Sequence, residues 1–314
     1  MRRRLHELFG VAMALITVTV LLQLTTGAVK GQASRATAWG HPNLEGIWLD
    51  VYSTPLERAV ELGKRELATA EERALRDQVQ LDRPSVLPSG AYNTVYTSAK
   101  PAGPRTSLVV DPPNGRIPFR TEEGEIRARR RGAARGYDSH ENRPAQERCL
   151  AWTHEGPPML PPPYNDLYQI FQAPGYVVLF PEMANNPPRI IPTDNRPHIS
   201  PKIRQWPGHS TGHWEGDTLV IDTVNFTEKT SFRGAGPELH VVERFTRTDA
   251  DTILYEFTVD DATTWSRPWS VAMPMKPSPG PLYEYSCHEG NYGIVNTMRG
   301  ARRADRVGDS DTAR

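Results

Sequence analysis

The sequence predicts a mainly β protein in which an antiparallel meander closes into a single β-barrel. Short runs of β-branched and aromatic residues alternate between apolar and polar side chains, which is the period of a β-strand. Tight turns with glycine or aspartate separate these runs, so successive strands are expected to pair as hairpins. The strands do not alternate with helices as a parallel sheet requires, and closure removes exposed edges. A β-sandwich or an open, incomplete propeller is the alternative.

The clearest hairpin is Gly208–Phe226, which reads GHSTGHWEGDTLVIDTVNF. Its turn is the tripeptide 215–217, and the run after the turn alternates so that Asp222 shares a face with two valines. In the run before the turn, His209 and His213 share one face, because residues an even number apart on a strand point the same way. A polar, imidazole-bearing strand is therefore expected to pair with an apolar one.

Further strands and a short helical insertion follow from the same signals. Two capping boxes, Thr54-Pro55-Leu56-Glu57 and Thr69-Ala70-Glu71-Glu72, predict two short helices within 55–81, after the first strand. In the run 239–248, His240 and Arg244 take one face and Glu243 the other. The remaining strands are expected at 46–52, 106–110, 168–171, 176–180, 189–192, 253–259, 265–273 and 283–287.

The N-terminus predicts export. Three arginines at 2–4 precede an apolar run at 8–24, and small residues follow, so 1–33 reads as a signal peptide cleaved after Ala28 or Ala33. An uncleaved anchor is the alternative, because the apolar run is long enough to span a bilayer. The mature chain is expected to be one barrel domain, 34–298, with a loop-rich stretch at 82–150, an arginine-rich solvated loop at 127–135 and a disordered tail at 299–314.

The net charge bears on which partners the protein binds, and the two cysteines bear on the cellular compartment in which it is expected. Basic and acidic residues number 37 each, so the formal net charge is zero and nucleic acid is not expected as a partner. In an oxidising compartment Cys149 and Cys287 are expected to form a disulfide; the alternative is two separate buried thiols. The protein is therefore expected in the periplasm or outside the cell, without stable membrane insertion once the signal is removed.

Candidate catalytic residues are His209, Asp222 and Glu243, which would act as general acid and base if they share the lumen. Four histidines fall near the barrel, and His209 with His240 would alternatively hold a transition metal or a haem iron. Structural hydrogen bonds for the histidines and a surface ion pair for Asp222 are the simpler alternatives. A serine hydrolase is not expected, because Ser210 and His209 are neighbours that point to opposite faces of a strand.

The composition of the C-terminal strands favours a binding protein, and an enzyme is the alternative. Aromatic residues at alternate positions suit a lumen that holds a small apolar or aromatic ligand. Candidate ligand-binding residues are His213, His240, Arg244, Tyr255 and Trp265. The enzyme would use the same cavity, either without a cofactor or with a metal or haem, as a lyase, isomerase or oxygenase. The sequence leaves open which of the two it is, what the cofactor is and how many copies associate.

The segment Arg148–Tyr285 resembles a group of uncharacterised secreted bacterial proteins. The shared signature is GHSxGxWEGDTLVxDTxxF, which stands here at Gly208–Phe226 and is followed by Leu239–Arg244 and Arg267–Trp269. The resemblance covers nearly half of the chain and implies a common fold, export and a common site. It implies no catalytic assignment, and the group often has a different basic residue at the position of His213.

A shorter motif, Gly46-x-Trp48, resembles the first strand of lipocalins, where the tryptophan plugs one end of the barrel. It implies a barrel of the calycin type, to which lipocalins belong. Lipocalins have no helical insertion after the first strand, so this chain departs from their pattern at 55–81. A tryptophan that packs into any β core explains the motif equally well.

Overall fold

The computed structural model describes residues 36–81, 100–133, 136–137, 139–152, 155–162, 165–183, 188–229 and 232–312. They belong to one compact unit that begins at Ala36. The expected signal peptide, 1–33, and residues 82–99 of the expected loop-rich stretch lie outside the described residues. Among the described helices, none combines the length and the apolar character needed to cross a membrane.

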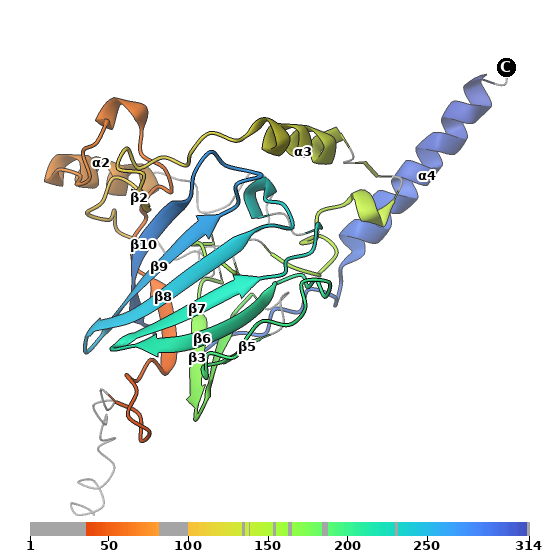
Figure 1. Ribbon diagram of the computed structural model, residues 1–314. Coiled ribbons are helices and arrows are strands. Elements are labelled where there is room, and N and C mark those ends of the chain that lie inside the picture. The colour runs from red at the N-terminus through yellow and green to blue at the C-terminus, as the bar shows by residue number, and fades with distance from the viewer. Residues whose placement is uncertain are drawn as a thin grey trace, which may run out of the picture. The chain divides into compact units, whose positions relative to one another are not determined.

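The fold is a ten-stranded antiparallel sheet that is nearly closed into a barrel, as the alternating pattern predicts. The order is β5-β4-β3-β1-β10-β9-β8-β7-β6, and β2 pairs with β10. Strands β6 to β10 lie side by side as a meander (Figure 1). The strands are β1 (Gly46–Asp50), β2 (Val109–Asp111), β3 (Tyr168–Ala173), β4 (Tyr176–Pro181), β5 (Arg189–Pro192), β6 (His209–Glu215), β7 (Thr218–Val224), β8 (His240–Asp249), β9 (Thr252–Asp260) and β10 (Trp269–Pro277). The strand expected at 283–287 is not formed.

The two edges of the sheet, β5 and β6, approach each other without a regular ladder. One backbone bond crosses just beyond β5, from Asn195 N to Gly212 O at 3.2 Å. A Cβ atom at Gly212 would lie 3.2 Å from Ile191 Cγ2 and 3.1 Å from Val220 O, which is tighter than ordinary packing. Glycine at this position therefore lets the edges approach closely.

The interior of the barrel is packed with aromatic side chains. Phe245 and Tyr255 have ring centroids 4.8 Å apart, and Trp265 lies edge-on to Trp269 at 5.7 Å. Phe257 connects the two pairs, with its centroid 5.8 Å from Tyr255 and 6.0 Å from Trp269. All five side chains are buried, and such tilted and edge-to-face contacts stabilise a core beyond their area burial.

A buried ion pair crosses this interior from the edge strand β5 to β8. Arg189 donates to both carboxylate oxygens of Glu243, at 3.1 and 2.5 Å. Tyr255 also donates to Glu243, at 2.8 Å, and Arg189 reaches Ser210 Oγ at 3.1 Å and Thr223 Oγ1 at 3.4 Å. One guanidinium thus contacts β6, β7 and β8 from β5.

Trp48 on β1 is buried, with its indole nitrogen donating to Leu44 O at 2.9 Å. The Arg247 guanidinium lies 5.5 Å from its ring centroid, which is a cation–π distance. β1 itself lies between β3 and β10. Gly46-x-Trp48 therefore belongs to a strand in the middle of the sheet, and the relation to lipocalins stays a prediction.

The helical insertion after β1 follows one capping box and not the other. Thr69 and Glu72 cap each other's backbone amides, at 2.8 and 3.2 Å, and the helix α2 (Ala70–Leu81) begins there. After Thr54 the chain forms only a short 3₁₀ turn, η1 (Val60–Leu62). The reason is that Pro55 O and Leu56 O accept hydrogen bonds from the segment that leads into β2, so they are not available to a helix.

Two predictions of irregular structure are wrong. The arginine-rich run expected as a loop forms most of α3 (Glu122–Ala133), whose first turn is capped by Thr121 and acidic, and whose last turn is basic. Arg127 in this helix donates to Thr264 Oγ1 at 2.7 Å and to Thr263 Oγ1 at 2.9 Å. Residues 299–312 of the tail expected to be disordered lie within α4 (Tyr292–Thr312), which the alanines and arginines of 299–306 favour.

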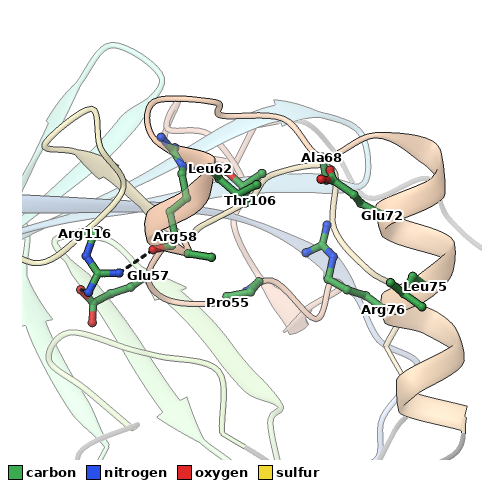
Figure 2. A pocket seen from close by; sticks show the side chains of 11 residues that line it. Pro55, Glu57, Arg58, Leu62, Ala68, Glu72, Leu75, Arg76, Thr106 and Arg116 are labelled. Atoms are coloured by element: carbon green, nitrogen blue, oxygen red, sulfur yellow. Dashed lines mark hydrogen bonds and ion pairs between the residues drawn. The ribbon is translucent and has the colours of Figure 1, made fainter.

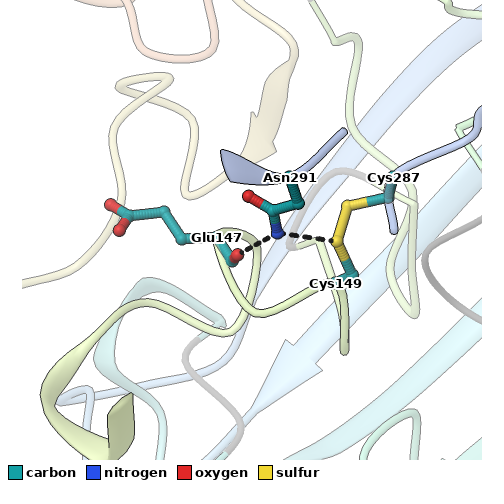
Figure 3. Close-up of a disulfide and its surroundings, with 4 residues drawn as sticks. All are labelled: Glu147, Cys149, Cys287 and Asn291. Carbon is teal, nitrogen blue, oxygen red and sulfur yellow. Dashed lines mark hydrogen bonds between the residues drawn. A yellow bond between two sulfur atoms is a disulfide. The ribbon is translucent and has the colours of Figure 1, made fainter. Parts of the chain in front are cut away.

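Cys149 and Cys287 form a disulfide (Figure 3). Asn291 donates its side-chain amide to Glu147 O at 2.9 Å and to Cys149 Sγ at 3.3 Å, so the start of α4 is tied to the bridge. Disulfides persist in oxidising compartments and are rare in the cytosol. The bridge therefore agrees with an extracytoplasmic location.

The buried ion pair yields a stability prediction. Glu243→Gln leaves Arg189 as an unpaired buried charge and should lower the free energy of unfolding by about 3–5 kcal/mol. Glu215→Gln is the matched control, because its partner Arg244 lies in an exposed pair, and it should change stability little. Urea denaturation measures both. Equal effects of the two substitutions would contradict a structural role for the buried pair.

The disulfide yields a second prediction. The bridge joins cysteines 138 residues apart, so its loss should cost about 5 kcal/mol of unfolding free energy by the chain-entropy relation. Chemical denaturation of a Cys149→Ser/Cys287→Ser variant against the native protein measures that difference. Thiol titration of the denatured, unreduced native protein should detect no free cysteine; two reactive thiols would show that the bridge is absent.

Candidate functional site

A cluster of polar residues lies on the outer face of the barrel, over β6, β7 and β8. In the antiparallel register Thr211 pairs with Asp222, and Asp222 pairs with Val242, so these residues share one face. His209 and His240 lie on that face at even spacings from Thr211 and Val242. The opposite face carries fully buried residues of the core. The cluster is therefore directed away from the lumen.

His198 completes the cluster from the segment 193–208, which connects β5 to β6. Its Nδ1 lies 2.9 Å from His209 Nδ1, and its Nε2 lies 2.8 Å from Asp222 Oδ1. His240 Nε2 lies 2.7 Å from the second oxygen, Asp222 Oδ2. Thr211 Oγ1 makes a longer contact of 3.4 Å with His198 Nε2. The side chains form one hydrogen-bonded chain, His209–His198–Asp222–His240.

Asn225 fixes the segment that carries His198. It follows β7, has a positive φ of 62° and is buried. Its side-chain amide donates to Ile199 O at 3.0 Å, and its backbone carbonyl accepts from Gln205 N at 2.9 Å. Asparagine adopts this left-handed conformation more readily than most residues. The loop is thereby held against the end of the hairpin, with His198 over Asp222.

When Asp222 is ionised and His198 is neutral, the hydrogen bonds of the cluster assign its protons. An ionised carboxylate only accepts hydrogen bonds, so His198 and His240 both donate to Asp222 through Nε2. Nδ1 of a neutral His198 then carries a lone pair and accepts the Nδ1–H of His209. Nε2 of His209 is left as an unprotonated nitrogen, and it has no hydrogen-bond partner among the described residues.

The surroundings of His209 and His240 shift the pKa values of these two histidines in opposite directions. Burial, and then the nearby His198, lower the pKa of His209. The hydrogen bond to Asp222 raises the pKa of His240. Burial alone raises the pKa of Asp222, but hydrogen bonds and charges from His240 and His198 outweigh it and leave the pKa below its usual range. At neutral pH, His209 is thus a neutral base and Asp222 an anion.

Glu243 does not belong to this cluster, so the three expected catalytic residues do not meet. β7 and β8 are paired with Ile221 opposite Glu243, which puts Glu243 on the inner face and Asp222 on the outer face. Glu243 is fully buried and bound to Arg189. The lumen is therefore not a common site for His209, Asp222 and Glu243.

The expected ligand-binding residues are likewise divided between the two faces. His213 and Arg244 lie outside and both contact Glu215, at 3.1 and 2.9 Å. Tyr255 and Trp265 lie inside, in the aromatic core, where burial and then Glu243 raise the pKa of Tyr255 well above its usual range. Only His240, bound to Asp222, lies in the outer cluster.

Two features of the motif have a structural explanation. Ser210 points inward, to Arg189 and to Thr223 Oγ1 at 2.9 Å, so it is not a nucleophile beside His209. At Gly208, with φ of 70°, a Cβ would lie 2.7 Å from Val224 O. The glycines around His209 therefore serve close backbone packing. His198 is one of the four histidines expected near the barrel, but the sequence predicted no contact between it and Asp222, and it predicted no role for Asn225.

A metal role for the histidines finds no support in their arrangement. Within the ranges that the structure describes, no group of three or more His, Cys, Asp or Glu side chains is placed to hold a metal ion. In the cluster the ring nitrogens of His198 face His209 and Asp222 rather than a common centre. The geometry instead suits proton transfer along the chain. Asp222 and His240 are 36% and 38% exposed, so a solute can reach them.

The Asp222–His240 pair should make stability depend on pH. The raised pKa of His240 contributes stability that is full below about pH 6.5 and is lost as pH rises through the folded pKa. The lowered pKa of Asp222 contributes stability that is present above about pH 3.9 and is lost as pH falls through the folded pKa. Asp222→Asn should therefore destabilise the protein most between these values. Unfolding measured against pH tests this, and a difference that does not vary with pH would refute it.

Comparison of the chain with family models, with curated proteins and with solved structures finds no match. The role of the cluster is therefore inferred from its own side chains. Those side chains form a hydrogen-bonded chain from Asp222 through His198 to His209, and that chain ends in an unprotonated nitrogen.

Proposed function

We propose that the protein is an exported β-barrel enzyme that uses His209 as a general base on a small molecule bound at the outer face. The observation that carries the proposal is the chain Asp222–His198–His209, in which Nε2 of His209 has no hydrogen-bond partner among the residues that the structure describes. A base held by a second hydrogen-bonded group, itself oriented by a carboxylate, is the arrangement that activates proton acceptors in enzymes. The reaction class is cofactor-free proton abstraction or water activation, as in a lyase, isomerase or hydrolase.

The cluster supplies each part of a proton transfer. Nε2 of His209 takes the proton, and the positive charge that develops on its ring is stabilised by the acceptor nitrogen of His198. Asp222 in turn stabilises and orients His198. The hydrogen bond from His240 to Asp222 keeps the carboxylate ionised and fixed. The lowered pKa of His209 makes it unprotonated, and hence competent, at neutral pH.

The packing of the barrel favours the outer face over the lumen as the place of a ligand. The expected small apolar or aromatic ligand would have to displace the buried rings around Tyr255 and Trp269, or separate Arg189 from Glu243. Disrupting such a core is costly, because protein interiors are packed as densely as organic crystals. Binding of an apolar ligand in the lumen stays a prediction without a specific observation in its favour.

Export and membership of the secreted bacterial group are part of the proposal. The disulfide supports an oxidising compartment, and the N-terminal residue pattern supports a signal peptide. The signature Gly208–Phe226 forms β6, β7 and the residue pair Asn225 and Phe226, so it carries most of the cluster. We propose that this group shares the outer site.

Hydrolysis of p-nitrophenyl acetate, an activated ester, tests His209 without knowledge of the natural substrate. A free imidazole nitrogen accelerates this hydrolysis as a base or nucleophile. The native protein should exceed buffer, and the rate should rise with pH through a pKa below about 6.5, the ordinary value for histidine. His209→Gln should remove most of the excess rate.

His213→Gln is the matched control, because His213 lies on the same outer face but contacts Glu215. It should retain the native rate. Asp222→Asn should lower the rate and shift its pH dependence, since the carboxylate acts through His198. If His209→Gln and His213→Gln reduce the rate equally, or neither does, His209 is not the base.

A further inference from the structure

A cavity separate from the histidine cluster lies in the helical insertion, between α2 and the segments that contain Arg58 and Thr106. Its volume is about 410 Å³, within the range of small-molecule pockets. Figure 2 shows that the Arg76 side chain extends from α2 into the space between this helix and the segment that contains Arg58. The histidine cluster contributes no residue to its lining.

Apolar side chains form much of the cavity wall. Pro55 and Leu62 line one side, and Ala68 and Leu75 contribute from α2 and the residues before it. Leu75 is 66% exposed, so its side chain is open to contact with a ligand in the cavity. The cavity therefore offers carbon contacts to the body of a ligand.

The charges at the cavity are not balanced. The lining carries three arginines and two glutamates. Glu72 is bound by Arg65, which lies outside the lining, and Glu57 lies 3.9 Å from Arg116 and accepts from Ile117 N at 3.0 Å. Arg76, in contrast, donates only to Gly103 O, at 3.2 Å, and no carboxylate of the described residues lies within ion-pair distance of it. The guanidinium of Arg76 is thus a partly exposed cation with unused donors.

Arg58 adds a second positive charge and makes the wall rigid. It is 1% exposed and has no acidic hydrogen-bond partner among the described residues. Its donors instead reach Thr106 Oγ1 at 2.8 Å, Pro113 O at 2.8 Å and Gly63 O at 3.2 Å. Glu66 interacts with Arg58 electrostatically, but no carboxylate hydrogen-bonds it among the described residues, so the guanidinium adds positive charge to the cavity wall.

We propose that this cavity binds a small carboxylic acid with an apolar body. The carboxylate would accept two parallel hydrogen bonds from Arg76, the geometry that a guanidinium favours. The carbon chain or ring would lie against Leu62 and Leu75. This site is independent of the histidine cluster, so it stands or fails separately from the proposed catalysis.

Calorimetric titration of the purified protein at neutral pH with hexanoate and with its uncharged counterpart hexanamide tests the proposal. Hexanoate should bind and hexanamide should bind at least about tenfold more weakly, as expected for loss of a charged hydrogen-bond partner. Arg76→Gln should weaken hexanoate by a similar factor and leave hexanamide unchanged. NMR should show shifts of the Leu62 and Leu75 methyl resonances on addition of hexanoate.

Arg73→Gln is the matched control, because Arg73 is exposed on the same helix and does not line the cavity. It should leave hexanoate binding unchanged. Equal binding of hexanoate and hexanamide would overturn the assignment of a carboxylate site. Absence of hexanoate binding, equal losses in the Arg76 and Arg73 variants, or methyl shifts confined to other leucines would overturn it as well.

Discussion

The bidentate ion pair between Arg189 and Glu243 connects the edge strand β5 to β8 across the interior, where β5 and β6 form no regular hydrogen-bond ladder. The sheet ends at β5 and β6, and within the described ranges a single backbone bond, from Asn195 N to Gly212 O, crosses between the neighbourhoods of these two strands. Arg189 reaches from β5 to side chains on β6, β7 and β8, and Tyr255 of β9 joins the same carboxylate. Burial of two charges is costly, so the pair is stable only because nearly all of its donors and acceptors are engaged. The barrel is therefore closed by a polar network rather than by a complete ladder.

That interior arrangement explains why the reactive groups lie outside. Aromatic rings and an ion pair pack the interior of the barrel, whereas Asp222 and His240 lie on the outer face and are partly exposed to solvent. β7 serves both faces at once: Thr223 points inward to Arg189, and its neighbour Asp222 points outward to the histidines. Asp222 is thus held in place by a strand whose other face packs in the core. A group that acts in proton transfer, as proposed for this cluster, needs such fixed orientation.

Much of the fold was accessible from the sequence because it depends on local patterns. The alternation in 239–248 and the turn at 215–217 predicted β6 to β8, and it separated His240 from Glu243 correctly within their strand. What a strand pattern cannot give is register across a long connection. The 15 residues between β7 and β8, 225–239, are too many for a tight hairpin turn that would fix the pairing, so the sequence did not reveal whether Asp222 and Glu243 share a face.

The other differences also have physical causes. His198 reaches Asp222 from a loop, and its position depends on the bonds of Asn225 rather than on any period. The arginines of α3 looked like a solvated loop because the partners of Arg127, Thr263 and Thr264, lie far away in the sequence. Contacts between side chains so far apart in the sequence can be identified only in the folded structure.

The disulfide between Cys149 and Cys287 makes the chain between these residues a covalently closed ring. The covalent ring that it closes contains every strand from β3 to β10, and only β1 and β2 lie outside it. A protease that cuts one loop inside this ring opens it without releasing a fragment. A protein outside the cell meets such enzymes routinely, and here a single cut leaves the two ends attached to one molecule, held in place by the sheet until the bridge is reduced.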